Sequence, residues 1–220
     1  MAPFGTIYSY PNNPRVAKIR AVANINGLTL EDAPFTFRET NRTPDFLAKF
    51  PLGKVPAFTS ADGVNLFESG AIAQYVAESG PARDQLVGSS PAERALIQQW
   101  ILLAENEITT HCMTCLLPRL GVGKYDEAAE TRALQGMERA LAALETRLAS
   151  RTWVATEAKL SLADITIVQS LVWGFRLVID REMREKYPVV VAYFKRVIES
   201  EGVKEAFGEP VFVEKREVPQ

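Results

Sequence analysis

The residue pattern of this chain changes once, between residues 80 and 91. Before that stretch, short runs of β-branched and aromatic residues alternate with segments of helical periodicity, whereas after it every periodic segment is helical. The stretch itself is rich in glycine, proline and serine, which is typical of a connection. This division predicts an α/β domain over residues 1–80, a linker over 81–90 and an all-helical domain over 91–220.

The first part of the chain has the order of a strand–helix–strand unit. Residues 5–10 are β-branched and aromatic, and they end at the turn-forming run 11–14. Pro14 suits the first turn of a helix, and Gly27 is placed to end that helix in a left-handed conformation. Residues 31–37 follow as a second strand, so the two strands should be parallel and joined by a right-handed crossover.

The following residues complete a small mixed sheet. A short helix should begin after Thr43, which is a favourable N-cap residue. Residues 55–59 and 65–68 have the pattern of two strands around a turn at 61–63, and a further helix begins near Ser69. The order of strands and helices therefore predicts an α/β domain with a mixed sheet.

The helical part carries two clear signals. One buried stripe on a long helix over residues 125–149 is predicted by apolar residues at alternating spacings of three and four, namely Leu134, Met137, Leu141, Leu144 and Leu148. Ser161 and Asp164 have the spacing of a capping box at the start of a later helix.

Charge and composition exclude several classes of protein. The chain has 25 basic and 27 acidic residues, a net charge of −2, which argues against a nucleic-acid binder with a basic face. The most apolar segment, residues 165–179, contains Gln169 and Arg176 and is shorter than the roughly 20 residues of a membrane span. The start of the chain lacks the basic and apolar regions of a signal peptide. We therefore expect a cytoplasmic protein without a membrane or nucleic-acid partner.

The chain resembles the cytosolic glutathione transferase family through three ordered motifs, at residues 50–57, 67–72 and 161–164. Three further runs are similar to the transferase-like region of elongation factor 1-gamma, at residues 5–8, 40–45 and 117–121. The resemblance implies a glutathione transferase fold, with a thioredoxin-like α/β N-terminal domain and an all-α C-terminal domain. It also implies glutathione as co-substrate and a homodimer with residues 50–57 and the helices after residue 91 near the interface. Elongation factor 1-gamma continues into a further domain after this region, whereas the present sequence stops at Gln220. We therefore expect a free-standing relative of the translation factor.

The resemblance assigns a set of glutathione-binding residues. It implies that the Val55–Pro56 bond is cis and that the Val55 backbone pairs with the cysteinyl part of glutathione. Ser69 would bind the γ-glutamyl carboxylate at a helix N-terminus, where free N–H groups favour an anion, and Glu68 would bind the ammonium group. Ser69 as a simple helix cap is the alternative. Three residues match positions that face the glycine carboxylate, with a solvated surface role as the alternative: Asn41, Arg42 and Lys54.

The residue that activates the thiol is less well determined. A hydrogen-bond donor near the first helix would lower the pKa of the thiol, because it favours the charged form. Asn12, after a proline, resembles a fungal transferase-like pattern in which this asparagine faces the sulfur. Ser9 shares strand parity with Ile7 and matches the catalytic position of other classes. We rank Asn12 first and Ser9 second, and a turn-forming asparagine is the alternative.

The run from His111 to Cys115 contains a C-x-x-C pair. Zinc normally requires four ligands, and the whole chain has one histidine and two cysteines, so we expect no metal. Buried packing is the simplest interpretation of the two cysteines, and a redox-sensing pair is the alternative. Since the resemblance places the substrate pocket against this helix, His111 and Cys115 are candidate lining residues.

Two functions follow from the sequence. The first is an enzyme that activates glutathione for attack on a small hydrophobic electrophile, in detoxification or in secondary-metabolite biosynthesis. The second is a non-catalytic transferase-fold module for protein–protein contact, related to elongation factor 1-gamma. The glutathione-binding motifs are compatible with both.

Overall fold

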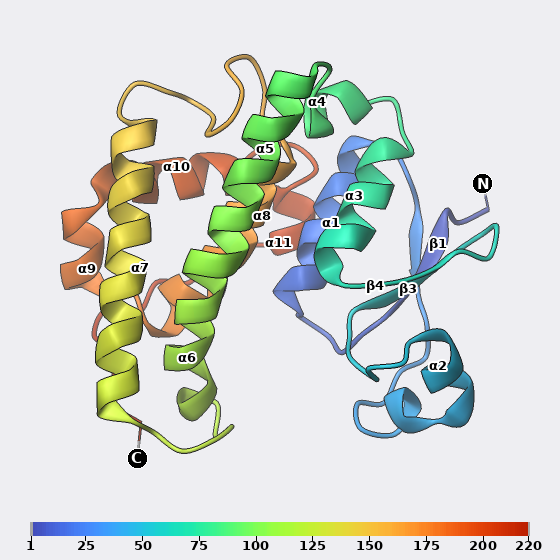
Figure 1. Ribbon diagram of the computed structural model, residues 1–220, viewed down its shortest axis with the longest axis horizontal. Coiled ribbons are helices and arrows are strands. Elements are labelled where there is room, and N and C mark those ends of the chain that lie inside the picture. Colours follow the sequence, from blue (N-terminus) through green and yellow to red (C-terminus); the bar gives the residue numbers. More distant parts are fainter. Residues whose placement is uncertain (1, 220) are drawn as a thin grey trace.

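The computed structural model describes residues 2–219, and its N-terminal part contains a four-stranded sheet in the order β2-β1-β3-β4 (Figure 1). β1 (Gly5–Tyr8) pairs in parallel with β2 (Leu30–Asp32) and antiparallel with β3 (Ala57–Ser60). β3 pairs antiparallel with β4 (Asn65–Phe67). The sheet is therefore mixed, as predicted.

Two helices cover one face of this sheet and separate it from the helical part (Figure 1). α1 (Pro14–Ile25) is capped by Asn13, whose side chain accepts a hydrogen bond from the Arg15 N–H, and Gly27 follows its end at a φ of +65°. α3 (Ser69–Glu78) packs against α1. The predicted parallel pairing of the two strands around α1 and the glycine stop are confirmed.

The strands are shorter than the sequence predicts. β2 spans Leu30–Asp32 rather than residues 31–37, because Pro34 has no N–H to continue the ladder after the Ala33 N–H bonds to Ile7. β3 likewise begins at Ala57, after Pro56. A 3₁₀ turn, η1 (Thr40–Arg42), precedes α2 (Pro44–Lys49), whose predicted N-cap Thr43 accepts a hydrogen bond from the Phe46 N–H.

The rest of the chain is helical. Its helices are α4 (Arg83–Val87), α5 (Pro91–Leu103), the π-helical segment η2 (Ala104–Thr109), α6 (Thr110–Arg119), α7 (Glu127–Leu148), α8 (Leu162–Leu177), α9 (Arg181–Lys186), α10 (Pro188–Ile198) and α11 (Lys204–Phe207). α4 lies inside the stretch predicted as a linker, where its residues Leu86 and Val87 are buried. Within residues 2–219, no helix has the length and apolar character needed to cross a membrane.

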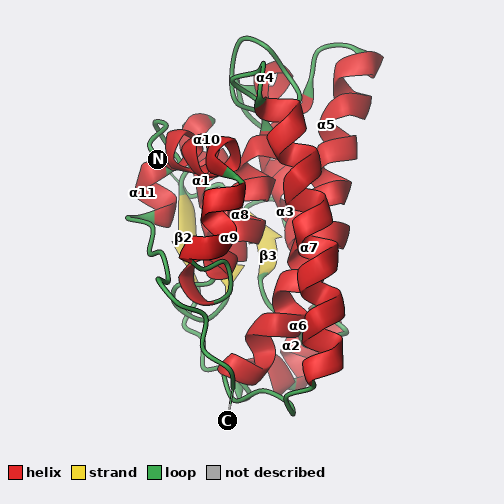
Figure 2. Ribbon diagram, turned by 90° about the vertical axis from the view of Figure 1, so that its left-hand side faces the viewer, coloured by secondary structure: helices red, strands yellow, loops and turns green. Residues whose placement is uncertain are grey.

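α8 is the central helix of this part. It contacts α1 of the sheet domain as well as α5, η2 and α6, and most of its residues are buried. The predicted capping box at its start is confirmed, and Asp164 also accepts hydrogen bonds from the Val154 N–H and the Tyr193 hydroxyl. Figure 2 shows α5, α6 and α7 together along one side of the molecule. Of the predicted α7 stripe, Leu134 is half-buried and the other four residues are buried.

Candidate active site

Four cavities lie around the β1–α1 loop and the first turns of α1. We call the first the polar cavity; it has a volume of about 480 Å³ and lies beside the turn before β3 and the start of α3. Its lining includes all seven residues predicted to bind glutathione: Asn41, Arg42, Lys54, Val55, Pro56, Glu68 and Ser69. Motifs separated by more than 25 residues in the sequence therefore meet around one space.

The turn before β3 forms one wall of the polar cavity. The Val55–Pro56 bond is cis, as expected. Asn41 is buried and donates through Nδ2 to the Gly53 carbonyl oxygen (2.6 Å), while its Oδ1 accepts from the Arg38 N–H (2.7 Å). Because both ends of this amide are engaged within the protein, Asn41 holds the wall of the cavity together.

The start of α3 forms the opposite wall. Glu68 is the N-cap residue and has a φ of +67°, a conformation that is unfavourable for a residue with a side chain and that is concentrated at functional sites. Ser69 is the first residue of the helix, and no side chain caps this end. The interpretation of Ser69 as a simple cap is therefore wrong. The first N–H groups of α3 are available to an anion.

The charges of the polar cavity favour an anionic ligand. Three cationic side chains line it, from Arg15, Arg42 and Lys54, against the single carboxylate of Glu68. The positive end of the α3 dipole adds to this excess. A ligand with two carboxylates and one ammonium group has the complementary charge.

A second cavity, the interdomain cavity, continues from the polar cavity and has a volume of about 510 Å³. Arg15, Glu68 and Ser69 line both. In its wall, fully buried Lys18 of α1 donates through Nζ to Glu105 Oε1 of η2 (3.1 Å). Burial lowers the pKa of Lys18, and the Glu105 carboxylate opposes this effect. Sequence reasoning missed this pair, because its members are 87 residues apart.

The third cavity, the apolar cavity, has a volume of about 440 Å³ and lies between the β1–α1 loop, α6 and α8. One helical face supplies much of its lining, with the spacings 3, 1, 3, 1 and 3: Thr109, Cys112, Met113, Leu116, Leu117 and Leu120. Trp173 of α8 and Phe37 lie on other sides. Such a space fits a small hydrophobic molecule.

The two residues predicted to line the substrate pocket lie on a different face of α6. A methyl group at Gly136 would lie 2.2 Å from His111 Nε2, so the imidazole is packed against α7. Cys115 is fully buried, and Cys112 lines the apolar cavity in its place. Burial raises the pKa of Cys112 to about 12 and that of Cys115 to about 11.

The fourth cavity, the rear cavity, has a volume of about 540 Å³ and lies on the side of the β1–α1 loop away from the turn before β3. Ser9 and Asn12 line this cavity, and neither lines the polar or the apolar cavity. The Ser9 hydroxyl accepts a hydrogen bond from Asn13 Nδ2 (3.0 Å), and Asn12 is exposed at a φ of +58°. The structure therefore does not bring the two predicted thiol-activating residues to the glutathione-binding set.

Tyr10 and Arg15 lie where the polar and apolar cavities meet. Both residues line both cavities, together with Phe37, whose ring is 5.8 Å from that of Tyr10. A reacting atom shared by ligands in the two cavities would lie near Tyr10, Arg15 and Phe37. The cluster of polar residues after β1 indicated that this loop supplies the thiol-activating group. The backbone of the turn, however, decides which cavity each of these side chains faces. In residues 2–219 no group of three or more His, Cys, Asp or Glu side chains is arranged to hold a metal ion.

Comparisons with known proteins agree with this geometry. Residues 3–78 match the family model of the glutathione S-transferase N-terminal domain, and residues 103–201 match that of the C-terminal domain. A Fusarium protein named glutathione S-transferase-like protein LUC7 is 46% identical over 99% of both chains. The crystal structure of the GST-like domain of elongation factor 1-gamma from Saccharomyces cerevisiae matches with a TM-score of 0.85 and 25% identity over 100% of both chains. Glutathione S-transferase I from maize, in complex with an atrazine glutathione conjugate, matches with a TM-score of 0.81 and 25% identity over 94% of this chain and 97% of that one.

Proposed function

Because the chain belongs to the glutathione S-transferase family, we propose that it binds glutathione in the polar cavity and activates its thiol for attack on a small hydrophobic electrophile in the apolar cavity. The observation that carries this proposal is the contact between the two cavities. All seven expected binding residues line the polar cavity, and this cavity shares Tyr10, Arg15 and Phe37 with the apolar one. A thiol and an electrophile can therefore meet without leaving their sites.

The binding mode follows from the walls of the polar cavity. The γ-glutamyl carboxylate accepts from Ser69 and the first N–H groups of α3, and its ammonium group pairs with Glu68. The Val55 backbone pairs with the cysteinyl part. Arg42 and Lys54 bind the glycine carboxylate. This arrangement directs the sulfur toward the apolar cavity.

Activation requires a group that stabilises the thiolate, which is the attacking nucleophile. We place the Tyr10 hydroxyl and the Arg15 guanidinium in this role, since each lines both cavities. A donor or a cation beside the sulfur lowers the pKa of the thiol. Asn12 and Ser9 remain the alternatives drawn from the sequence, and substitution decides between the two pairs.

The direct test combines two measurements on the purified protein. Calorimetric titration should show glutathione binding, and glutathione should displace chloride from 1-chloro-2,4-dinitrobenzene faster with the protein than without it. In this reaction the sulfur bonds to the ring carbon, chloride leaves as an anion and the thiol proton passes to solvent. Absence of glutathione binding would exclude the proposal.

A second candidate function is a transferase-fold module for protein–protein contact. The match to the GST-like domain of yeast elongation factor 1-gamma over the whole chain favours it. Binding of glutathione without turnover of any electrophile, neither the dinitrobenzene nor a panel of enones and epoxides, would support this module over the enzyme.

A further inference from the structure

The apolar and rear cavities are neighbours across a thin wall. Tyr10, Pro14 and Trp173 line both, so one residue of the β1–α1 loop, the first residue of α1 and one residue of α8 lie between the two spaces. A molecule lying over these residues would contact both cavities at once. The two cavities, of about 440 and 540 Å³, together offer more space than a small aromatic electrophile fills.

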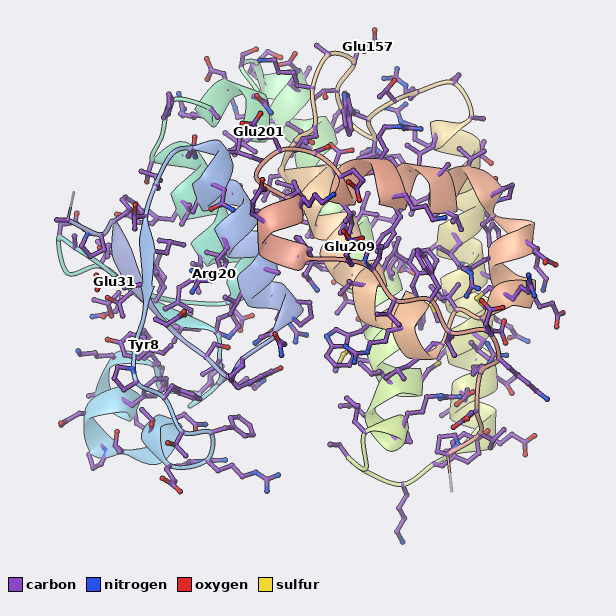
Figure 3. All side chains as sticks on the ribbon, turned by 180° about the vertical axis from the view of Figure 1, so that it is seen from behind. Tyr8, Arg20, Glu31, Glu157, Glu201 and Glu209 are labelled. Atoms are coloured by element: carbon purple, nitrogen blue, oxygen red, sulfur yellow. The ribbon has the colours of Figure 1, made fainter. Side chains whose placement is uncertain are left out.

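The two ends of this region differ in chemistry. Arg15 is the only charged side chain that lines the apolar cavity within residues 2–219, and it lies at the end shared with the polar cavity. The rear cavity, in contrast, is lined by Arg20 of α1, Asp32 of β2, Arg176 of α8 and Glu209 of the segment after α11. Figure 3 shows Arg20 and Glu209 on this rear side of the molecule.

One of these charges has no counterion in the described part of the chain. Arg20 is paired with Asp32, and Glu209 Oε1 lies 3.8 Å from Lys204 Nζ. Arg176 forms no ion pair in residues 2–219, and its guanidinium lies over the Trp173 ring, 5.2 Å from the centroid. An exposed cation therefore stands beside the residue that divides the two cavities.

We propose, on the basis of the proposed function, that the electrophile is an elongated amphiphile with an anionic end. Its apolar body, with the reacting carbon, occupies the apolar cavity against α6, and its chain passes over Trp173. Its carboxylate or sulfonate group pairs with Arg176 in the rear cavity. Asn12, which lines the rear cavity, contacts this end of the substrate rather than the glutathione sulfur.

A binding experiment tests this assignment without any turnover. The probes are 8-anilinonaphthalene-1-sulfonate and its uncharged counterpart N-phenyl-1-naphthylamine, followed by fluorescence. Arg176→Gln should weaken binding of the sulfonate about fivefold and leave the uncharged probe within twofold, because only the first loses a charge pair. Trp173→Ala should weaken both. The matched control is Arg83→Gln on α4, an exposed arginine that lines none of the four cavities.

A kinetic experiment separates this inference from the proposed function. The substrates are 1-chloro-2,4-dinitrobenzene, 6-(4-chloro-3-nitrobenzamido)hexanoate and the methyl ester of the latter, each losing chloride to the glutathione sulfur. In Arg176→Gln, kcat/KM should fall about fivefold for the hexanoate alone. The inference would be overturned if Arg176→Gln changed kcat/KM equally for the acid and the ester, or left binding of the sulfonate probe unchanged. Turnover of the dinitrobenzene would still support the proposed function in that case. If nothing is turned over, the enzyme proposal fails and the probe result alone decides whether this anion site exists.

Discussion

At the scale of single residues, Cys112 and Cys115 show how burial controls chemistry. Burial raises the pKa of the two thiols from an ordinary 9.0 to about 12 and about 11. At pH 8 the thiolate fraction is then lower than that of an ordinary cysteine by about 1,000-fold and about 100-fold, respectively. Both thiols should react with 5,5′-dithiobis(2-nitrobenzoate) at pH 8 far more slowly in the native protein than in denaturant. Fast native labelling that Cys112→Ser or Cys115→Ser removes would contradict this assignment.

Ser69 provides a direct test of the ligand-binding wall. Ser69→Ala should weaken glutathione binding by about 1.5–3 kcal/mol, the value of a hydrogen bond to a charged group. The free energy of unfolding should change little, because Ser69 makes no capping bond. Calorimetric titration measures the affinity. The matched control is Ser79→Ala at the other end of α3, where the hydroxyl donates to the Tyr75 carbonyl oxygen; this variant should bind glutathione normally.

Tyr10, Asn12 and Ser9 make competing predictions for the thiol. Tyr10→Phe should raise the pKa of the thiol of bound glutathione, because it removes a donor to the thiolate, whereas Asn12→Ala and Ser9→Ala should leave it unchanged. Ultraviolet thiolate absorbance of the complex against pH gives this pKa. A shift in Asn12→Ala or Ser9→Ala alone would restore the sequence-based ranking.

The same residues show what a sequence can predict about a site. Ordered motifs predicted that Val55, Glu68 and Ser69 share one site, and all three line the polar cavity, since their backbone positions are set by a strand end and a helix start. The loop after β1 offered four polar side chains within five residues, from Ser9, Tyr10, Asn12 and Asn13. Only its fold, with Asn13 turned inward as the α1 cap and Asn12 at a positive φ, shows which of them faces which cavity.

At the scale of elements, the helical periodicity of α6 separates the residues that line the apolar cavity from those that do not. Residues 112, 113, 116, 117 and 120 share one face by helical spacing, and these line the apolar cavity. His111 and Cys115 are four residues apart, so they share another face. A helical projection of this segment would have predicted Cys112 rather than Cys115 for the cavity. The length of β2, in contrast, depended on the single missing donor of Pro34.

The contact between α1 and η2 makes stability depend on pH. Burial lowers the pKa of Lys18 from its ordinary value of 10.5, so below pH 10.5 the unfolded chain binds more protons at this residue than the native one. Burying the charged ammonium group therefore lowers the free energy of unfolding by its full amount below the native pKa of Lys18. This loss of stability disappears as the pH rises to 10.5. The stability of the wild type relative to Lys18→Met should rise between these pH values, measured by urea unfolding at a series of pH values. A difference in stability between wild type and Lys18→Met that stays constant across this pH range would contradict the argument.

At the scale of the whole molecule, we predict a homodimer, with residues 50–57 and the helices after residue 91 near its interface. Two leucines of α5 are exposed, Leu96 by 39% and Leu102 by 47%, so this helix presents apolar side chains to a partner subunit. Light scattering should give a mass of twice 24.4 kDa, and Leu102→Glu should weaken association about tenfold or more. Val218→Glu, at an exposed position near the C-terminus, is the control and should remain dimeric. A monomeric wild type would refute the prediction.

Among residues 2–219 the polar and apolar cavities share three lining residues, Tyr10, Arg15 and Phe37, and this small overlap has an evolutionary consequence. Substitutions along α6 change the shape of the apolar cavity without touching Val55, Glu68 or Ser69. A duplicated gene can therefore drift toward new electrophiles while it keeps one nucleophile. The same separation allows a descendant protein to lose turnover of electrophiles in the apolar cavity and still bind a peptide ligand in the polar cavity.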